Sequence, residues 1–148
     1  MAPIAVTTDG ADPPVAIVEL TGEHDGFTTH RIEQELARLL DAGMPIVVDL
    51  LQASFVDSST LSALLTAQRH AEEASLGFAL ALDDATSLQV HRIFATTGLE
   101  STFVVAPTRV EAIASARQGI AVPASEATPS KERSGAASNF ALQPGPQK

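Results

Sequence analysis

The sequence contains no cysteine, tryptophan or tyrosine. Without cysteine there can be no disulfides, thiolate metal sites, iron–sulfur clusters or cysteine nucleophiles. No run approaches the roughly 18 consecutive apolar residues that a membrane span requires. The first ten residues also lack the basic start and apolar core of a secretory signal. We therefore expect a cytoplasmic protein without membrane insertion.

Basic residues are scarce as well. Nine Lys and Arg stand against 18 Asp and Glu, which gives a formal charge of −9. Proteins that bind nucleic acid present clustered Lys and Arg to the phosphates, so no nucleic-acid partner is expected. A hydrophobic content of 45% in 148 residues is enough for one domain with a true core.

Composition changes near residue 119. Ala, Pro, Ser and Gly supply 17 of the 30 residues from 119 to 148, and apolar residues are scattered there. Such a segment buries too little surface to offset the entropy lost on ordering. The sequence therefore predicts a folded domain over residues 1–118 and a disordered tail over residues 119–148.

Within the folded part, two hydrophobic periods alternate. Short β-branched or apolar runs indicate strands, and apolar residues spaced three or four apart indicate helices. Because parallel neighbours need crossover helices, the alternation predicts a largely parallel sheet, and a further N-terminal strand would make it mixed. The strands are expected at 15–20, 46–50, 78–82 and 103–105, with the extra one at 4–8. The helices are expected around 32–40, 61–75, 90–97 and 110–114.

Catalytic and metal-binding motifs are missing. The four histidines show no HExxH spacing, and there is no glycine-rich phosphate loop or GxSxG turn. The adjacent Asp83 and Asp84 are better explained by a turn after a strand than by an acid pair. We expect neither an enzyme, nor a bound metal, nor a cofactor.

One segment stands out: the turn from Phe55 to Leu61, between a strand and an apolar helix. Either Asp57 or Ser58 can cap the helix, but a cap needs only one side chain and four polar ones occur in a row. A hydroxyl here can also accept a phosphoryl group, because a helix N-terminus offers free N–H groups and a favourable dipole to phosphate. Both interpretations stay open on these residues alone.

A second polar segment, residues 21–25, follows the strand at 15–20. It is expected to form a turn in which Gly22 supplies backbone freedom and Asp25 or Thr28 caps the next helix. Because the ends of parallel strands converge at one edge of a sheet, this segment and the Asp57 turn are expected to be neighbours.

These motifs, in this order and spacing, resemble the STAS domains of bacterial anti-sigma factor antagonists. The resemblance covers about residues 15–116. It implies an α/β fold with a mixed sheet of about five strands and about four helices packed mainly on one side. The matching stretches are Leu20–Asp25, Val47–Leu50, Phe55–Ser59, Thr97–Leu99 and Phe103–Val105.

The resemblance implies a partner switch in transcription regulation, for example in a stress response. The unmodified protein would bind an anti-sigma factor, a serine kinase with ATP bound, and so release a sigma factor. The kinase would phosphorylate the second serine of the turn, which is Ser59, and a serine phosphatase would reverse the change. Thr60 stands where the family usually has Gly, and it adds bulk and a hydroxyl. The implied partner-binding residues are Glu23, Asp25, Asp57, Ser58, Thr60 and Leu61.

Two other functions are considered. The chain could be a STAS docking subunit that is not phosphorylated, beside the ATPase of a lipid transporter or in a stress-sensing complex, with Ser59 and Thr60 as caps and contacts. An enzyme or small-ligand carrier would need a pocket with convergent polar groups, which the sequence does not reveal. A monomer or weak dimer is expected.

Overall fold

A computed structural model describes residues 4–11 and 13–119. They form a mixed five-stranded sheet in the order β1-β2-β4-β6-β7. Its strands are β1 (Ile4–Asp9), β2 (Val15–Leu20), β4 (Ile46–Asp49), β6 (Phe78–Ala81) and β7 (Val104–Ala106). Only β1 runs antiparallel to its neighbour, and all the other pairs are parallel. Except for Gly119, the predicted tail of residues 119–148 lies outside the described residues.

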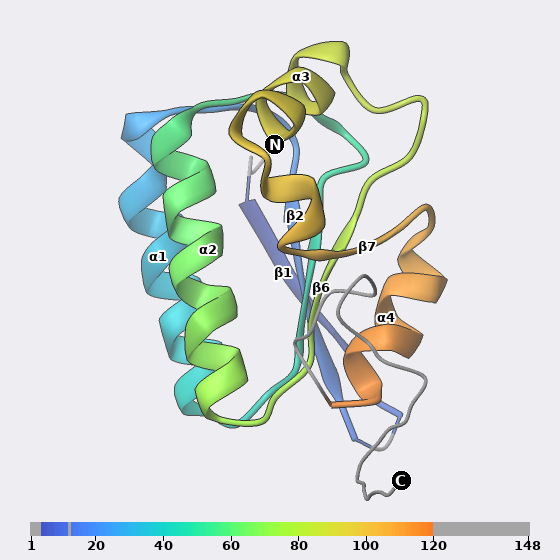
Figure 1. The fold of residues 1–148 in the computed structure, drawn as a ribbon. Helices are drawn as coiled ribbons and strands as arrows, with labels where there is room; N and C mark the ends of the chain where they lie inside the picture. The colour runs from blue at the N-terminus through green and yellow to red at the C-terminus, as the bar shows by residue number, and fades with distance from the viewer. Residues whose placement is uncertain (1–3, 12, 120–148) are drawn as a thin grey trace, which may run out of the picture.

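Four α-helices accompany the sheet in the described part of the chain (Figure 1). They are α1 (Gly26–Asp41), α2 (Ser58–Glu73), α3 (Leu88–Thr97) and α4 (Arg109–Arg117), with a short 3-10 helix η1 (Leu99–Ser101) after α3. The predicted order of strands and helices, including the N-terminal strand and the mixed sheet, is therefore confirmed. No helix in these residues is both long and apolar enough to cross a membrane.

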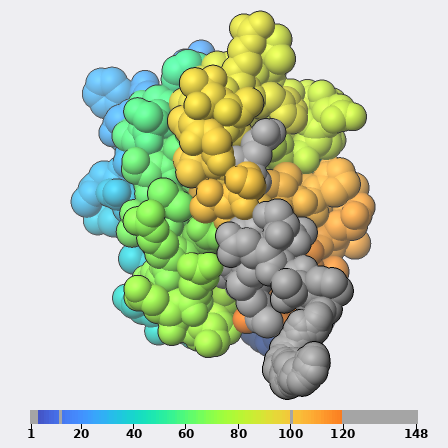
Figure 2. Space-filling view, in the orientation of Figure 1, coloured from blue at the N-terminus to red at the C-terminus, as the bar shows by residue number. Residues whose placement is uncertain are grey.

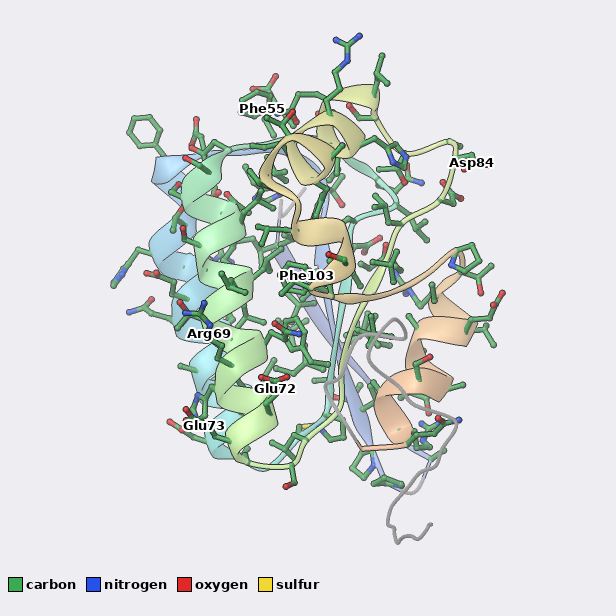
Figure 3. All side chains as sticks on the ribbon, viewed as in Figure 1. Phe55, Arg69, Glu72, Glu73, Asp84 and Phe103 are labelled. Carbon is green, nitrogen blue, oxygen red and sulfur yellow. The ribbon has the colours of Figure 1, made fainter. Side chains whose placement is uncertain are left out.

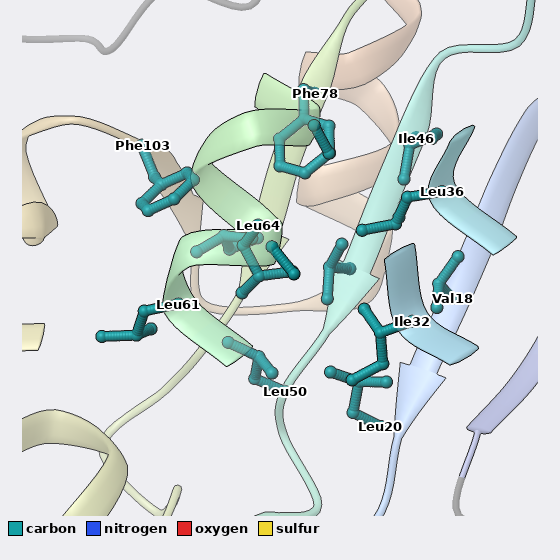
Figure 4. Close-up of a cluster of buried hydrophobic side chains, with 14 of the residues drawn as sticks. Val18, Leu20, Ile32, Leu36, Ile46, Leu50, Leu61, Leu64, Phe78 and Phe103 are labelled. Carbon is teal, nitrogen blue, oxygen red and sulfur yellow. The ribbon is translucent and has the colours of Figure 1, made fainter. Parts of the chain in front are cut away.

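The main core lies between the sheet and the pair α1 and α2. Alternate residues of the central strands face this side, as the period of two requires, and the apolar stripes of both helices pack on them (Figure 4). Residues that meet in this layer include Val18, Leu20, Ile32, Leu36, Ile46, Leu50, Leu61, Leu64, Phe78 and Phe103. This layer fixes where α1 and α2 begin relative to the sheet.

The other face of the sheet is covered by α4 (Figure 1). Its contacts with the sheet are made largely by small side chains, Ala112 and Ala116 on the helix and Ala79 and Ala81 on β6. The close approach also needs Gly77, because a Cβ there would lie 1.8 Å from the carbonyl oxygen of Ala116. The small side chains of Ala112 and Ala116 thus let α4 lie close against this face.

An arginine at each end of α4 forms ion pairs with residues of the sheet. Arg109 contacts the buried Asp49 at 2.7 Å and Glu19 at 3.2 Å, so it joins the start of α4 to β4 and β2. At the other end, Arg117 contacts Asp9 at 2.7 Å and donates to the carbonyl of Pro13 at 3.0 Å. Charge pairs therefore supplement the thin apolar contact of this helix.

Two further short strands were not predicted. Residues 21–25 were expected to form a turn, yet β3 (Gly22–His24) pairs in parallel with β5 (Ala53–Val56). Gly22 does adopt a positive φ of 79°, and its amide donates to the carbonyl of Gln52 at 3.0 Å. Neither segment is long enough to show a clear alternation of apolar and polar residues, so the hydrophobic pattern gave no strand signal.

Candidate functional site

The paired strands β3 and β5 bring the first turns of α1 and α2 together. The β3 strand leads into α1 and β5 leads into α2, and the amide of Asp57 donates to the carbonyl of His24 at 3.2 Å. Figure 1 shows both helices beginning at the same end of the molecule. The expectation that the two polar segments are neighbours is therefore confirmed.

Each helix begins at an aspartate cap. Asp25 accepts a hydrogen bond from the amide of Phe27 at 2.9 Å, and Asp57 accepts one from the amide of Thr60 at 3.0 Å. These bonds satisfy amides that have no partner within the helix. Of the two caps considered for α2, the structure selects Asp57 over Ser58, which is exposed.

Ser59 lies in the first turn of α2 and is half-buried. Its hydroxyl donates to the carboxylate oxygen Oδ1 of Asp57 at 2.7 Å. On its other side, Ser59 Oγ lies 2.8 Å from the hydroxyl oxygen of Thr29 in α1. The serine is therefore held between a carboxylate on its own turn and a hydroxyl on the neighbouring helix.

The same contacts set the charge state of Asp57. Burial raises the pKa of this carboxyl, but hydrogen bonds from Ser59 and Thr60 outweigh burial and hold the pKa below its usual value. At neutral pH, Asp57 is therefore a carboxylate immediately beside the Ser59 hydroxyl.

His24 and Thr60 form the inner support of the site. His24 is fully buried, with Nε2 at 3.1 Å from the carbonyl of Thr21 and Nδ1 at 3.1 Å from the hydroxyl of Thr28. Thr60 is also fully buried, and its hydroxyl lies 3.2 Å from the carbonyl of His24 and from Asp57 Oδ1. The bulk of Thr60 therefore points into the protein and ties α2 to β3, away from any partner.

The predicted partner-binding residues divide into two groups. Glu23 and Ser58 are exposed, and Asp25 and Asp57 are half-buried, all near Ser59 at the same end of the molecule. Thr60 and Leu61 are buried, with exposed fractions of 0% and 2%. Leu61 belongs to the main core, so these last two side chains support the turn and offer almost no surface for a partner.

Exposed apolar residues surround this end of the molecule. Phe27, in the first turn of α1, is 96% exposed, and Leu88, at the start of α3, is 62% exposed. Phe55, on β5, is 38% exposed and lies at the end where α1 and α2 begin (Figure 3). In the space-filling view, the light-blue first turn of α1 protrudes from the surface (Figure 2). Exposed aromatic residues beside a polar turn are typical of a protein-binding surface.

Sequence reasoning did not single out Thr29, which contacts Ser59, or the exposed Phe27. The only signal for Phe27 is that it lies off the apolar stripe formed by Ile32, Leu36, Leu39 and Leu40. Nothing in the local pattern distinguishes Thr29 from Thr28, because the contact between Thr29 and Ser59 spans 30 residues.

The structure also accounts for the other acidic segment. Asp83 accepts hydrogen bonds from the amides of Ala85 at 2.9 Å and Thr86 at 3.0 Å, so it forms the predicted turn after β6. Across residues 4–11 and 13–119, no group of three or more metal-ligating side chains is close enough to hold an ion.

Comparisons with known proteins agree with this architecture. A family model described as "Mlab, STAS domain" matches residues 7–106. An anti-sigma factor antagonist from Mycobacterium paratuberculosis is 27% identical over 77% of this chain and 94% of its own, with a TM-score of 0.63. No curated protein matches the sequence significantly.

Two further solved structures share the fold. The anti-sigma factor antagonist SpoIIAA in its unphosphorylated form is 19% identical over 78% of this chain and all of its own, with a TM-score of 0.56. The phosphorylated form of SpoIIAA from Bacillus is 24% identical over 74% of this chain and 97% of its own, with a TM-score of 0.54.

Proposed function

Because this chain belongs to the STAS domain family, we propose that it is an anti-sigma factor antagonist that is switched off by phosphorylation of Ser59. Its partner is an anti-sigma factor of the serine kinase type, with ATP bound on the partner's side. Binding of the unmodified antagonist releases a sigma factor, and a serine phosphatase restores the active form. The exchange takes place in the cytoplasm and needs no catalysis by this chain.

The observation that carries the proposal is the position of Ser59. Ser59 is half-buried in the first turn of α2, next to the exposed Ser58. The exposed Phe55 lies two residues before Asp57, and the exposed Phe27 lies two residues before Thr29, whose hydroxyl contacts Ser59. A hydroxyl that served only as a helix contact would not need exposed aromatic residues in the two segments that meet at it. The amides of the first helical turn and the positive end of the helix dipole favour a phosphate there.

The modification replaces the hydroxyl proton of Ser59 by a phosphoryl group. The bond from Oγ to phosphorus forms as the bond between phosphorus and the leaving ADP breaks, and the hydroxyl proton leaves as H⁺. Ser59 then carries about −1.5 to −2 charges and can no longer donate to Asp57. A contact of 2.7 Å between donor and acceptor becomes one between like charges.

The same change acts on the partner. The surface around Ser59 already carries Glu23, Asp25 and Asp57, so a partner that binds it is expected to present basic groups around an apolar site for Phe27 and Phe55. Basic groups that already pair with these carboxylates leave an added phosphate without a partner, and its desolvation opposes binding. To move the complex from 99:1 to 1:99, the partner must discriminate by about 5.5 kcal/mol.

The proposal is tested on the protein isolated from its native cells, during growth and after stress. Mass spectrometry of the peptide spanning Asp57 to Arg69 is expected to find phosphate on Ser59, with an occupancy that changes between the two conditions. Phosphate on Thr60 instead would move the site into a buried position and contradict this assignment. No phosphate in any condition would favour a docking subunit that is not phosphorylated, with Ser59 as a helix contact.

Binding gives a second test. Ser59→Ala is expected to bind the kinase-type partner in every growth condition, because it cannot be phosphorylated. Ser59→Asp is expected not to bind this partner. Thr66→Asp is the matched control, because it places one negative charge on an exposed residue of α2 outside the predicted partner-binding set. It is expected to bind as the unaltered protein does. If Ser59→Asp binds as tightly as the unaltered protein, the switch is wrong.

A further inference from the structure

We propose that Thr29 is a positioning residue for Ser59, and that its hydroxyl holds Ser59 Oγ in the orientation in which it receives a phosphoryl group. This inference rests on the proposed function and adds to it a residue on a different helix. Thr29 lies in the first turn of α1, 30 positions before Ser59, and their hydroxyl oxygens are 2.8 Å apart.

Three contacts compete for the protons of these two hydroxyls. Ser59 Oγ lies 2.7 Å from Asp57 Oδ1 and 2.8 Å from Thr29 Oγ1. Thr29 Oγ1 also lies 3.0 Å from the carbonyl oxygen of Asp25. The two hydroxyls have only two protons between them. The proton of Ser59 goes to Asp57, because a bond to a carboxylate is the strongest of the three.

The proton of Thr29 then has two possible acceptors. The carbonyl of Asp25 already accepts from the backbone amides of Thr28 at 3.0 Å and Thr29 at 3.1 Å. If Thr29 donated there, the lone pairs of Thr29 and Ser59 would face each other at 2.8 Å. Donation to Ser59 shifts the contact without a proton to the longer distance of 3.0 Å between Thr29 Oγ1 and the Asp25 carbonyl. It gives a continuous chain from Thr29 through Ser59 to the Asp57 carboxylate, in which each bond polarises the next.

This chain leaves Ser59 Oγ prepared for phosphoryl transfer. Its proton points to Asp57, one lone pair is held by Thr29, and one lone pair remains to form the bond to phosphorus. After transfer, the Thr29 hydroxyl still has a proton to donate to the ester or phosphate oxygens. Thr29 therefore favours both the formation and the retention of phosphoserine, so its loss lowers the fraction of Ser59 that is modified.

Three variants test the inference. Thr29→Val keeps the shape of the side chain and removes the hydroxyl, whereas Thr29→Ser keeps the hydroxyl. Thr66→Val is the matched control, because Thr66 is an exposed residue of α2 at a distance from the turn. Ser59 occupancy is measured by mass spectrometry on each full-length variant from the native cells.

In Thr29→Val the ratio of phosphorylated to unmodified Ser59 is expected to fall about two- to tenfold, the factor that loss of one hydrogen bond corresponds to. Thr29→Ser and Thr66→Val are expected to keep the original occupancy. Equal occupancy in Thr29→Val and the unaltered protein would overturn the role of Thr29 but leave the proposed function standing. Absence of phosphate on Ser59 in the unaltered protein would overturn the proposed function, and this inference with it.

A second measurement separates positioning from general destabilisation. In purified Thr29→Val, the bond between Ser59 and Asp57 loses its cooperative support, so the pKa of Asp57, followed by NMR of its carboxyl carbon, is expected to rise toward its usual value. In Thr66→Val the pKa of Asp57 is expected to equal that in the unaltered protein. An unchanged pKa of Asp57 in Thr29→Val would contradict the proposed hydrogen-bond chain even if occupancy fell.

Discussion

The side chain of Gln89 pairs with the backbone of Val56 by two hydrogen bonds, as a neighbouring strand would. The amide of Val56 donates to Gln89 Oε1 at 2.9 Å, and Gln89 Nε2 donates to the carbonyl of Val56 at 2.9 Å. Through this pair, α3 covers the edge of β5 that faces away from β3. Val56, which directly precedes Asp57, is thereby held between β3 and α3.

Removing this pair is expected to destabilise the protein. Gln89→Ala leaves the amide and the carbonyl of the buried Val56 without these partners, and each unsatisfied buried group costs about 1–3 kcal/mol. We expect the free energy of unfolding, measured in urea, to fall by about 2 kcal/mol or more. Gln34→Ala, at an exposed position of α1, is the matched control and is expected to change it by less than about 0.5 kcal/mol.

Gly77 is expected to tolerate no side chain. In Gly77→Ala the new Cβ would lie 1.8 Å from the carbonyl oxygen of Ala116, so α4 must move away from β6. Overpacking of this kind costs about 1–3 kcal/mol, to be measured by urea unfolding followed by circular dichroism. Gly26→Ala is the control, because a Cβ at the start of α1 meets no atom within 4 Å. Equal stability of the two variants would refute the close approach of α4.

Acid is expected to weaken the Ser59 turn. The pKa of Asp57 in the folded protein lies below its usual value of 3.8, so the carboxylate contributes stability above that pH. The contribution is lost as the pH falls through the folded pKa. Asp57→Asn keeps a capping side chain but does not titrate. Its unfolding free energy is therefore expected to fall less steeply between about pH 5 and pH 3 than that of the unaltered protein.

A parallel loss of stability at acid pH is expected at the far end of α4. The amide of Ala11 and the Arg117 guanidinium hold the pKa of Asp9 below its usual value. The unfolding free energy of Asp57→Asn is therefore still expected to decrease as the pH falls. This decrease is expected to be smaller in the double variant that also carries Asp9→Asn. If the double variant retains the full slope of Asp57→Asn, Asp9 makes no such contribution.

Phe27 is expected to contribute to partner binding and not to folding. Its side chain is 96% exposed, so Phe27→Ala removes almost no buried contact and is expected to change stability by less than about 0.5 kcal/mol. Buried aromatic residues dominate binding energy at interfaces, so affinity for the kinase-type partner, measured by calorimetry, is expected to drop about tenfold or more. Val110→Ala, at a 77% exposed apolar residue of α4, is expected to leave that affinity unchanged.

Long, strongly periodic elements could be predicted from the sequence. The apolar stripe from Ile32 to Leu40 buries one face of a helix, and the run Ile46–Leu50 is buried on both faces of the sheet. The local pattern of each segment reports its burial. The Asp57 turn could be predicted for the same reason, since a polar cap between a strand and an apolar helix is a local feature. Gly98, with a positive φ of 72°, ends α3 directly after the helix predicted around residues 90–97.

The individual contacts between distant residues could not be predicted, although the proximity of the two polar segments was. The pairing of β3 with β5, the bonds from Gln89 to Val56 and the contact from Thr29 to Ser59 each join segments about 30 residues apart. None of these contacts produces a recognisable hydrophobic periodicity in the sequence of either segment. The inward orientation of Thr60 is a further case, because whether a first-turn residue faces solvent or the interior depends on what lies beneath it, here the carbonyl of His24.

The position of α4 at the end of the described chain has a consequence for biosynthesis. All five strands of the main sheet leave the ribosome before residues 109–117 do, so the face formed by Val15, Ile17 and Val47 has no cover in the nascent chain. Exposed apolar surface of this kind is what chaperones recognise and what promotes aggregation during synthesis. Arg109 and Arg117 act at longer range than the alanines between them, so charge attraction can guide α4 onto this face before close packing is established.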